Sequence, residues 1–157
     1  MEKENFSLLY DDADKKILQV AEDTIDRSVD RLQEIISFAR EAGIRRIGIA
    51  NCTTFTREAK NLQTLLTGEG FNVERVHCKY GRMPFSDVVE GYEGISCNPA
   101  GQAEYLDEKG TELNIMMGLC IGHDMIFNAK SKAPVTPLVV KDRKLGHKTF
   151  EMLRAEK

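Results

Sequence analysis

The chain lacks the long hydrophobic run that a membrane-spanning helix requires. Crossing a bilayer takes about 20 consecutive apolar residues, and no stretch of these 157 residues approaches that length. The chain also lacks a basic excess, since 22 Lys and Arg stand against 25 Asp and Glu, for a formal net charge of −3. General nucleic-acid binders usually carry a basic patch. We therefore expect neither a membrane nor a nucleic acid as a partner.

A secretory signal is also missing from the first residues. They read MEKENFSLLYDDADKK, which is polar and acidic, whereas a signal peptide needs an apolar segment near its start. A cytoplasmic location is therefore the expectation. In that reducing compartment, the four cysteines are expected as thiols, metal ligands or catalytic groups rather than as structural disulfides.

What the sequence does contain is an alternation of helical and strand patterns. Helices are expected over residues 11–22, 26–42, 55–67, 99–109 and 123–131 and near the C-terminus, and strands near 46–50, 72–77, 113–119 and 135–141. Such alternation implies right-handed crossovers and a mostly parallel sheet. The predicted fold is a three-layer α/β domain whose four-stranded sheet has the order 2-1-3-4. Helices cover both faces, and one or two extra helices precede the first strand.

Length and composition favour a single domain. A chain of 157 residues with 41% hydrophobic and 30% charged residues is typical of one soluble domain with its own core. We expect residues 1–157 to form this domain, with residues 1–10 as a loose N-terminal arm. Residues 81–94 read as a long loop with a short helical turn at residues 86–90, and loops of that length are often functional.

The predicted topology gathers the cysteines at one edge of the sheet. Cys52 follows the first strand, Cys78 follows the second and Cys120 ends the third, while Cys97 opens the helix that leads into the third. The carboxyl ends of parallel strands share an edge, and ligands of such sheets bind there. A single cysteine is often just a small buried hydrophobe, but four at strand ends favour a functional site.

A metal site is the leading interpretation of this cluster. Cys120 and His123 have the C-x-x-H spacing that lets one sulfur and one imidazole bind the same soft cation. The predicted metal ligands are Cys52, Cys78, Cys97, Cys120 and His123. Four protein ligands would make a structural zinc site, three plus water a catalytic one, and an iron–sulfur cluster would also accept thiolates from separate loops. No C-x-x-C pair is present, which argues against a zinc ribbon and a thioredoxin motif.

Two alternatives need no metal. Helix N-termini lower thiol pKa values, and Cys52 and Cys97 both precede predicted helices. Either could therefore be the reactive thiolate of a thiol-dependent enzyme or redox protein. The third interpretation is a sensor for a small molecule or an anion, bound at helix N-termini in a cleft that the cysteines merely line.

Three longer motifs carry a resemblance to a known group. GISCNPAGQAEYL, TELNIMMGLCIGHD and SKAPVTPLVVKDRKLGH resemble small prokaryotic proteins of unknown function that are often labelled metal-binding. The likeness covers roughly residues 43–147 and implies that the four cysteines, His123 and Asp124 are the positions to watch. Many members begin with an additional cysteine cluster, whereas this chain has no cysteine before Cys52.

Overall fold

The computed structural model describes residues 5–154, and the chain forms two compact units, Met1–Ile44 and Arg45–Lys157. The first unit contains the 3-10 helix η1 (Phe6–Leu9) and the helices α1 (Asp12–Thr24) and α2 (Arg31–Glu41). The predicted loose arm, residues 1–10, lies partly outside the described residues. Its described part includes η1, whose Phe6, Leu8 and Leu9 side chains are exposed.

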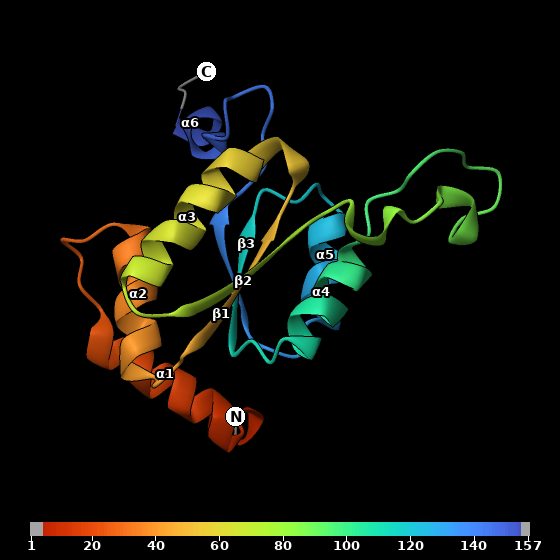
Figure 1. Cartoon of the computed structure of the whole chain (residues 1–157). Helices are drawn as coiled ribbons and strands as arrows, with labels where there is room; N and C mark the ends of the chain where they lie inside the picture. Colours follow the sequence, from red (N-terminus) through yellow and green to blue (C-terminus); the bar gives the residue numbers. More distant parts are fainter. Residues whose placement is uncertain (1–4, 155–157) are drawn as a thin grey trace. The chain divides into compact units, whose positions relative to one another are not determined.

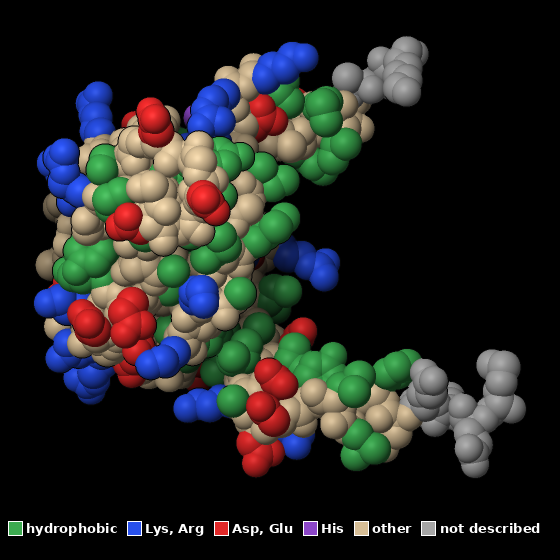
Figure 2. All heavy atoms as spheres, turned by 90° about the vertical axis from the view of Figure 1, so that its right-hand side faces the viewer, with side chains coloured by type: hydrophobic (Ala, Val, Ile, Leu, Met, Phe, Trp, Pro, Cys, Tyr) green, Lys and Arg blue, Asp and Glu red, His purple; other side chains and the backbone are tan. Residues whose placement is uncertain are grey.

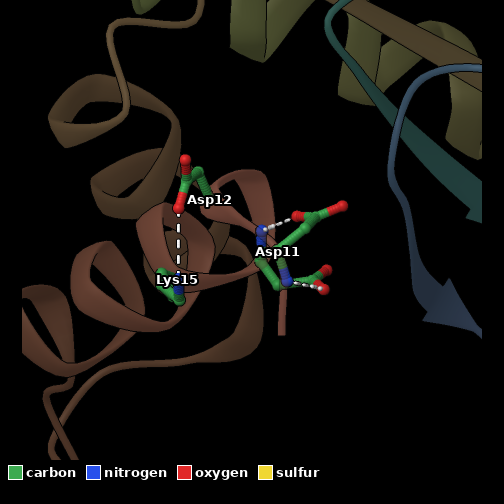
Figure 3. Close-up of polar contacts among 4 residues, drawn as sticks. Asp11, Asp12 and Lys15 are labelled. Carbon is green, nitrogen blue, oxygen red and sulfur yellow. Dashed lines mark hydrogen bonds and ion pairs between the residues drawn. The ribbon is translucent and has the colours of Figure 1, made fainter. Parts of the chain in front are cut away.

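Helix α1 begins with a capping box. The Asp11 carboxylate accepts a hydrogen bond from the Asp14 backbone N–H at 2.9 Å, and the Asp14 carboxylate accepts one from the Asp11 N–H at 3.1 Å. One turn into the helix, Lys15 forms an ion pair with Asp12 at 3.1 Å (Figure 3). The two capping-box hydrogen bonds satisfy backbone donors that the start of a helix would otherwise leave unpaired.

The second helix starts later than the sequence pattern predicted. It was expected from residue 26, but it begins at Arg31. The Asp26 carboxylate accepts hydrogen bonds from the backbone N–H and the hydroxyl of Ser28, at 2.9 and 2.6 Å, which holds a turn there. Asp30 then forms a capping box with Gln33, so the helix begins at the better cap.

The second unit is built on a parallel sheet, as predicted. Within the described residues its strands are β1 (Arg46–Asn51), β2 (Asn72–His77), β3 (Leu113–Met117) and β4 (Val135–Val139), in the order β2-β1-β3-β4. Every neighbouring pair is parallel. β4 is an edge strand, which suits the prolines Pro134 and Pro137 because proline cannot complete a hydrogen-bonded ladder.

Helices cover both faces of this sheet. Helix α3 (Thr56–Gly68) packs on one face, and α4 (Pro99–Glu108) and α5 (His123–Lys130) pack together on the other (Figure 1). Between α4, α5 and the sheet lies a buried cluster that includes Ala103, Leu106 and Phe127. A C-terminal helix, α6 (Thr149–Arg154), follows β4. The predicted α/β class, the strand order and the extra N-terminal helices are therefore confirmed.

The segment between β2 and α4 contains little regular structure. The helical turn predicted at residues 86–90 is instead the 3-10 helix η4 (Phe85–Asp87). An antiparallel bridge between Pro84 and Ile95 closes the segment into a loop, and the Phe85 N–H donates to the Gly94 carbonyl at 2.8 Å. This loop returns the chain to the carboxyl edge of the sheet just before Cys97.

The surface is mixed in character. Seen from the side of α4 and α5, Figure 2 shows Lys and Arg side chains interspersed with Asp and Glu among hydrophobic residues. In the part of the chain that the structure describes, no helix has the length and apolar character needed to cross a membrane.

Candidate functional site

All four strands end at the same level of the sheet. In the register, Asn51 of β1 pairs with His77 of β2 and with Met117 of β3, and Met117 pairs with Val139 of β4. Whatever follows these residues must therefore emerge at one edge. This alignment places distant parts of the sequence side by side.

Two cysteines continue the ladder one residue beyond their strands. The Cys52 N–H donates to the Met117 carbonyl at 3.1 Å, and the Cys78 N–H donates to the Asn51 carbonyl at 2.9 Å. Cys97 joins them because the backbone N–H of Asn98, the next residue, donates to the Cys78 carbonyl at 2.7 Å. Backbone hydrogen bonds thus hold three of the predicted site residues at adjacent positions.

The sulfurs of these three cysteines form a contiguous row. Cys78 Sγ lies 4.0 Å from Cys52 Sγ and 3.6 Å from Cys97 Sγ. Cys78 and Cys52 are buried, with 2% and 6% of their surface exposed, whereas Cys97 is half-buried. All four cysteines of the chain are free thiols. The row therefore runs from the interior toward solvent.

Cys120 is connected to this row through a lysine. Lys141 Nζ lies 2.7 Å from Cys52 Sγ and 3.5 Å from Cys120 Sγ, and Arg143 Nη2 lies 3.5 Å from Cys120 Sγ. Both cations follow the edge strand β4 and reach sulfurs that follow β1 and β3. The site consequently combines four thiols with two cations.

The lysine alters the ionisation of Cys52. Burial raises the pKa of the Cys52 thiol, but hydrogen bonds from Lys141 and Thr54 and the lysine charge outweigh it and lower the pKa to about 6. Cys52 is therefore largely a thiolate at neutral pH. Burial also lowers the pKa of Lys141, but its contacts with Cys52 and Cys120 bring the pKa above its usual value, so the ammonium stays charged.

The pKa of Cys78 is shifted in the opposite direction from that of Cys52. Burial raises the pKa of its thiol to about 11; the backbone N–H of Thr53 opposes this, and the neighbouring Cys52 and Cys97 reinforce it. That N–H lies 3.4 Å from Cys78 Sγ. Adjacent sulfurs with pKa values pushed apart are typical of a nucleophile and its neutral partner.

A short loop after β4 positions the cations. The His147 N–H donates to the Asp142 carbonyl at 2.7 Å, and the Asp142 N–H donates back to His147 Nδ1 at 2.9 Å. The His147 ring packs edge-on against Phe55 at 4.7 Å, and Lys141 Nζ lies 5.9 Å above the same Phe55 ring. Phe55 in turn packs so closely on Gly118 that a Cβ there would collide with its ring.

Asn98 holds Cys97 at the start of α4. Its side-chain oxygen accepts from the Gly101 N–H at 2.8 Å, which caps the helix, and its amide donates to the Tyr80 carbonyl at 3.3 Å. A Cβ at Gly101 would overlap the Asn98 side chain. The absence of a side chain at Gly101 therefore leaves the space that the capping side chain of Asn98 occupies.

Gln102 is a buried polar residue beneath the site. Its side chain is fully buried, and its amide donates to the carbonyls of Asn51 and Val76, at 3.3 and 3.0 Å. It thereby clamps the ends of β1 and β2 just before the cysteines. Among the described residues, its Oε1 atom has no hydrogen-bond partner.

The structure does not gather every predicted ligand. His123 begins α5, where its backbone N–H donates to the Cys120 carbonyl at 3.0 Å, and its ring makes none of the sulfur contacts described above. Across residues 5–154, no group of three or more His, Cys, Asp or Glu side chains is arranged to hold a metal ion. The metal-ligand set stays a prediction.

Sequence reasoning missed Lys141 and Arg143. A signal for them existed, because Lys141 ends the fourth predicted strand and Arg143 follows it, much as Cys52 and Cys78 follow the first and second. The rule that the carboxyl ends of parallel strands share an edge applies to all four strands equally.

The fold and this site define a parallel α/β protein with a thiol cluster at the carboxyl edge of its sheet. A family model described as "Protein of unknown function (DUF1847)" matches residues 1–138. The chain belongs to that family.

One similar protein is the uncharacterized protein MJ0455 of Methanocaldococcus jannaschii. The two are 46% identical over 124 residues, which cover 76% of this chain and 64% of the archaeal protein. This chain therefore matches less than two thirds of the length of that relative.

Proposed function

We propose that this protein is a thiol–disulfide redox protein in which Cys52 is the reactive thiolate. The observation that carries the proposal is the 2.7 Å contact between Lys141 Nζ and Cys52 Sγ. Thiolates, not thiols, attack disulfides, and a fixed ammonium favours the thiolate. Of the two cysteines that the sequence nominated, this contact favours Cys52 over Cys97.

Cys78 is the partner that closes the disulfide. The Cys52 thiolate attacks a disulfide RSSR, forming a mixed disulfide and releasing RS⁻. Cys78 then attacks Cys52 sulfur, its proton passes to solvent, and the second RS⁻ leaves. The net reaction oxidises two thiols and reduces one disulfide to two thiols. The 4.0 Å between the two sulfurs must shorten to about 2.05 Å when the disulfide forms.

The first step prepares the second. The charge of Cys52 is one of the causes, after burial, that raise the pKa of Cys78. Once Cys52 is part of a mixed disulfide, that charge is gone and Cys78 loses its proton more readily. A cytoplasmic location belongs to this proposal, because reduced thiols persist in that compartment.

The test uses the reduced full-length protein and 2-hydroxyethyl disulfide, followed by peptide mass spectrometry. The expected product is a Cys52–Cys78 disulfide. The Cys78→Ser variant should stop at a mixed disulfide on Cys52, and the Cys97→Ser control should still form the internal bond. Reaction of Cys52 at the rate of a free thiol, or an internal disulfide between Cys52 and another cysteine in Cys78→Ser, would overturn the proposal.

Metal binding is a second candidate, supported by the sulfur spacing. Zn–S bonds of about 2.3 Å put two sulfurs of a tetrahedral site about 3.8 Å apart, close to the 4.0 and 3.6 Å found here. Cys52, Cys78 and Cys97 would be the ligands for zinc or for an iron–sulfur cluster. The sulfurs form a row, so the outer two would have to rotate toward a common point.

Elemental analysis separates the two candidates. Protein purified without added metal should contain near-stoichiometric zinc or iron if the second is correct, and the Cys78→Ser variant should lose most of it. Metal below about a tenth of the protein concentration, together with a Cys52–Cys78 disulfide, supports the redox protein.

A further inference from the structure

Two cations converge on the thiols without any carboxylate to balance them. Lys141 and Arg143 each lie 3.5 Å from Cys120 Sγ, and within the described ranges neither forms an ion pair with Asp or Glu. The acid between them, Asp142, is engaged elsewhere, because its carboxylate accepts from the Leu145 N–H at 3.0 Å. Among the described residues, neither cation is therefore held in place by a carboxylate.

The two cations have different roles. Lys141 is half-buried and lies against the Cys52 sulfur, whose negative charge balances it. Arg143 is exposed and touches Cys120 Sγ. An arginine stays charged under all ordinary conditions, and its planar group suits carboxylate and phosphate oxygens. Arg143 is thus the cation that an approaching molecule can reach.

We infer that the disulfide which Cys52 attacks is anionic, with a carboxylate or another oxyanion bound by Arg143. This inference rests on the proposed function, because it names the substrate class of the same site. An anion on Arg143 lies beside Cys120, and Lys141 connects Cys120 to Cys52 through contacts of 3.5 and 2.7 Å. A substrate held there presents its sulfurs to the thiolate.

Electrostatics supports the same assignment. A thiolate ordinarily repels an anionic disulfide, whereas here Lys141 lies against the Cys52 sulfur and Arg143 adds an exposed positive charge beside Cys120. Such a site attracts anions and disfavours cations, and added salt weakens both effects. The exchange chemistry is unchanged, with RS⁻ leaving from an anionic rather than a neutral disulfide.

The experiment compares three small disulfides of different charge: dithiodipropionate (anionic), 2-hydroxyethyl disulfide (neutral) and cystamine (cationic). Each rate at Cys52, followed by peptide mass spectrometry, is divided by the rate of the same disulfide with 2-mercaptoethanol. This correction removes differences between leaving groups. We expect the corrected rate to be about tenfold higher for the anion than for the cation at low salt.

Two variants locate the effect. Arg143→Gln should slow the anionic disulfide about fivefold more than it slows the neutral one. Lys144→Gln removes the same charge from the next residue, which is exposed, and should change neither rate by more than about twofold. Equal slowing of all three disulfides in Arg143→Gln, or no charge preference in the wild type, overturns the inference.

The outcomes also distinguish a failure of this inference from a failure of the proposed redox function on which it rests. If Cys52 reacts with no disulfide faster than a free thiol does, the redox proposal itself fails. If Cys52 reacts fast with the neutral disulfide and shows no preference for the anion, the redox proposal stands and the anionic substrate is wrong.

Discussion

Lys141 Nζ lies 2.7 Å from Cys52 Sγ although 89 residues separate the two in the chain. One follows the edge strand β4 and the other the inner strand β1, and β3 lies between these strands. The lysine side chain thus spans the end of a strand to reach the sulfur. This contact determines the protonation state of Cys52, and it leads directly to the first two predictions.

Replacing Lys141 by methionine should make Cys52 less reactive. The pKa of Cys52, about 6 in the wild type, should rise toward the ordinary value for a thiol, so alkylation by iodoacetamide at pH 7 should slow about tenfold. Peptide mass spectrometry over a pH series measures the alkylation rate of Cys52 and hence its pKa. The control is Lys132→Met, which removes a lysine that pairs with Asp107. An unchanged Cys52 rate in Lys141→Met would show that the lysine does not activate the thiol.

The same contact makes stability depend on pH. The pKa of Cys52 is about 6 in the folded protein against an ordinary 9.0, so the unfolded chain binds more protons between these values. Folding stability from this group therefore rises with pH across that window, and is lost as pH falls through about 6.

Urea unfolding of the wild type and Cys52→Ser measures this contribution. The wild type should gain stability relative to the variant between pH 5 and pH 8. Cys78 and the other thiols are present in both proteins and cancel to first order. A difference that stays constant, or shrinks with rising pH, would contradict the ionisation of Cys52.

Gly118 supports the site by leaving room for Phe55. A Cβ at Gly118 would collide with the Phe55 ring, and the backbone there has a positive φ of 60°. Gly118→Ala should therefore cost about 2–4 kcal/mol of unfolding free energy, from strain and overpacking together.

Gly110→Ala is the matched control for that change. Its φ is 65°, and nothing lies within 4 Å of an added Cβ, so about 1 kcal/mol is expected from the left-handed backbone alone. Denaturant midpoints decide the comparison. Equal losses in the two variants would mean that the contact with Phe55 contributes nothing.

Asn98 should restrain Cys97. Asn98→Ala removes the cap of α4, which typically costs about 1 kcal/mol. If that loss is local, the opening equilibrium around Cys97 rises about fivefold, and so does the alkylation of Cys97. Asp30→Ala removes a comparable cap from α2 in the other unit and should leave Cys97 unaffected. Peptide mass spectrometry of the alkylated protein measures both.

Local patterns in the sequence were enough to predict most of the fold. The largely apolar stretch at residues 113–117, interrupted only by Asn114, became the fully buried strand β3, and the alternation of helices with strands predicted the parallel sheet. These features depend on residues close in sequence, where periodicity acts directly. The predicted start of α2 was wrong because two candidate cap residues, Asp26 and Asp30, lie within a few residues of each other.

The sequence by itself also determined which cysteines approach the carboxyl edge, since each follows a strand or opens a helix there. It did not determine how they meet. Strand register and side-chain direction decide that Cys52, Cys78 and Cys97 form a row and that Lys141 lies between Cys52 and Cys120. They also decide that the His123 ring takes no part in these contacts. A slip of one residue in the pairing would turn every side chain of a strand to the opposite face, so these contacts depend on how strands remote in sequence pair.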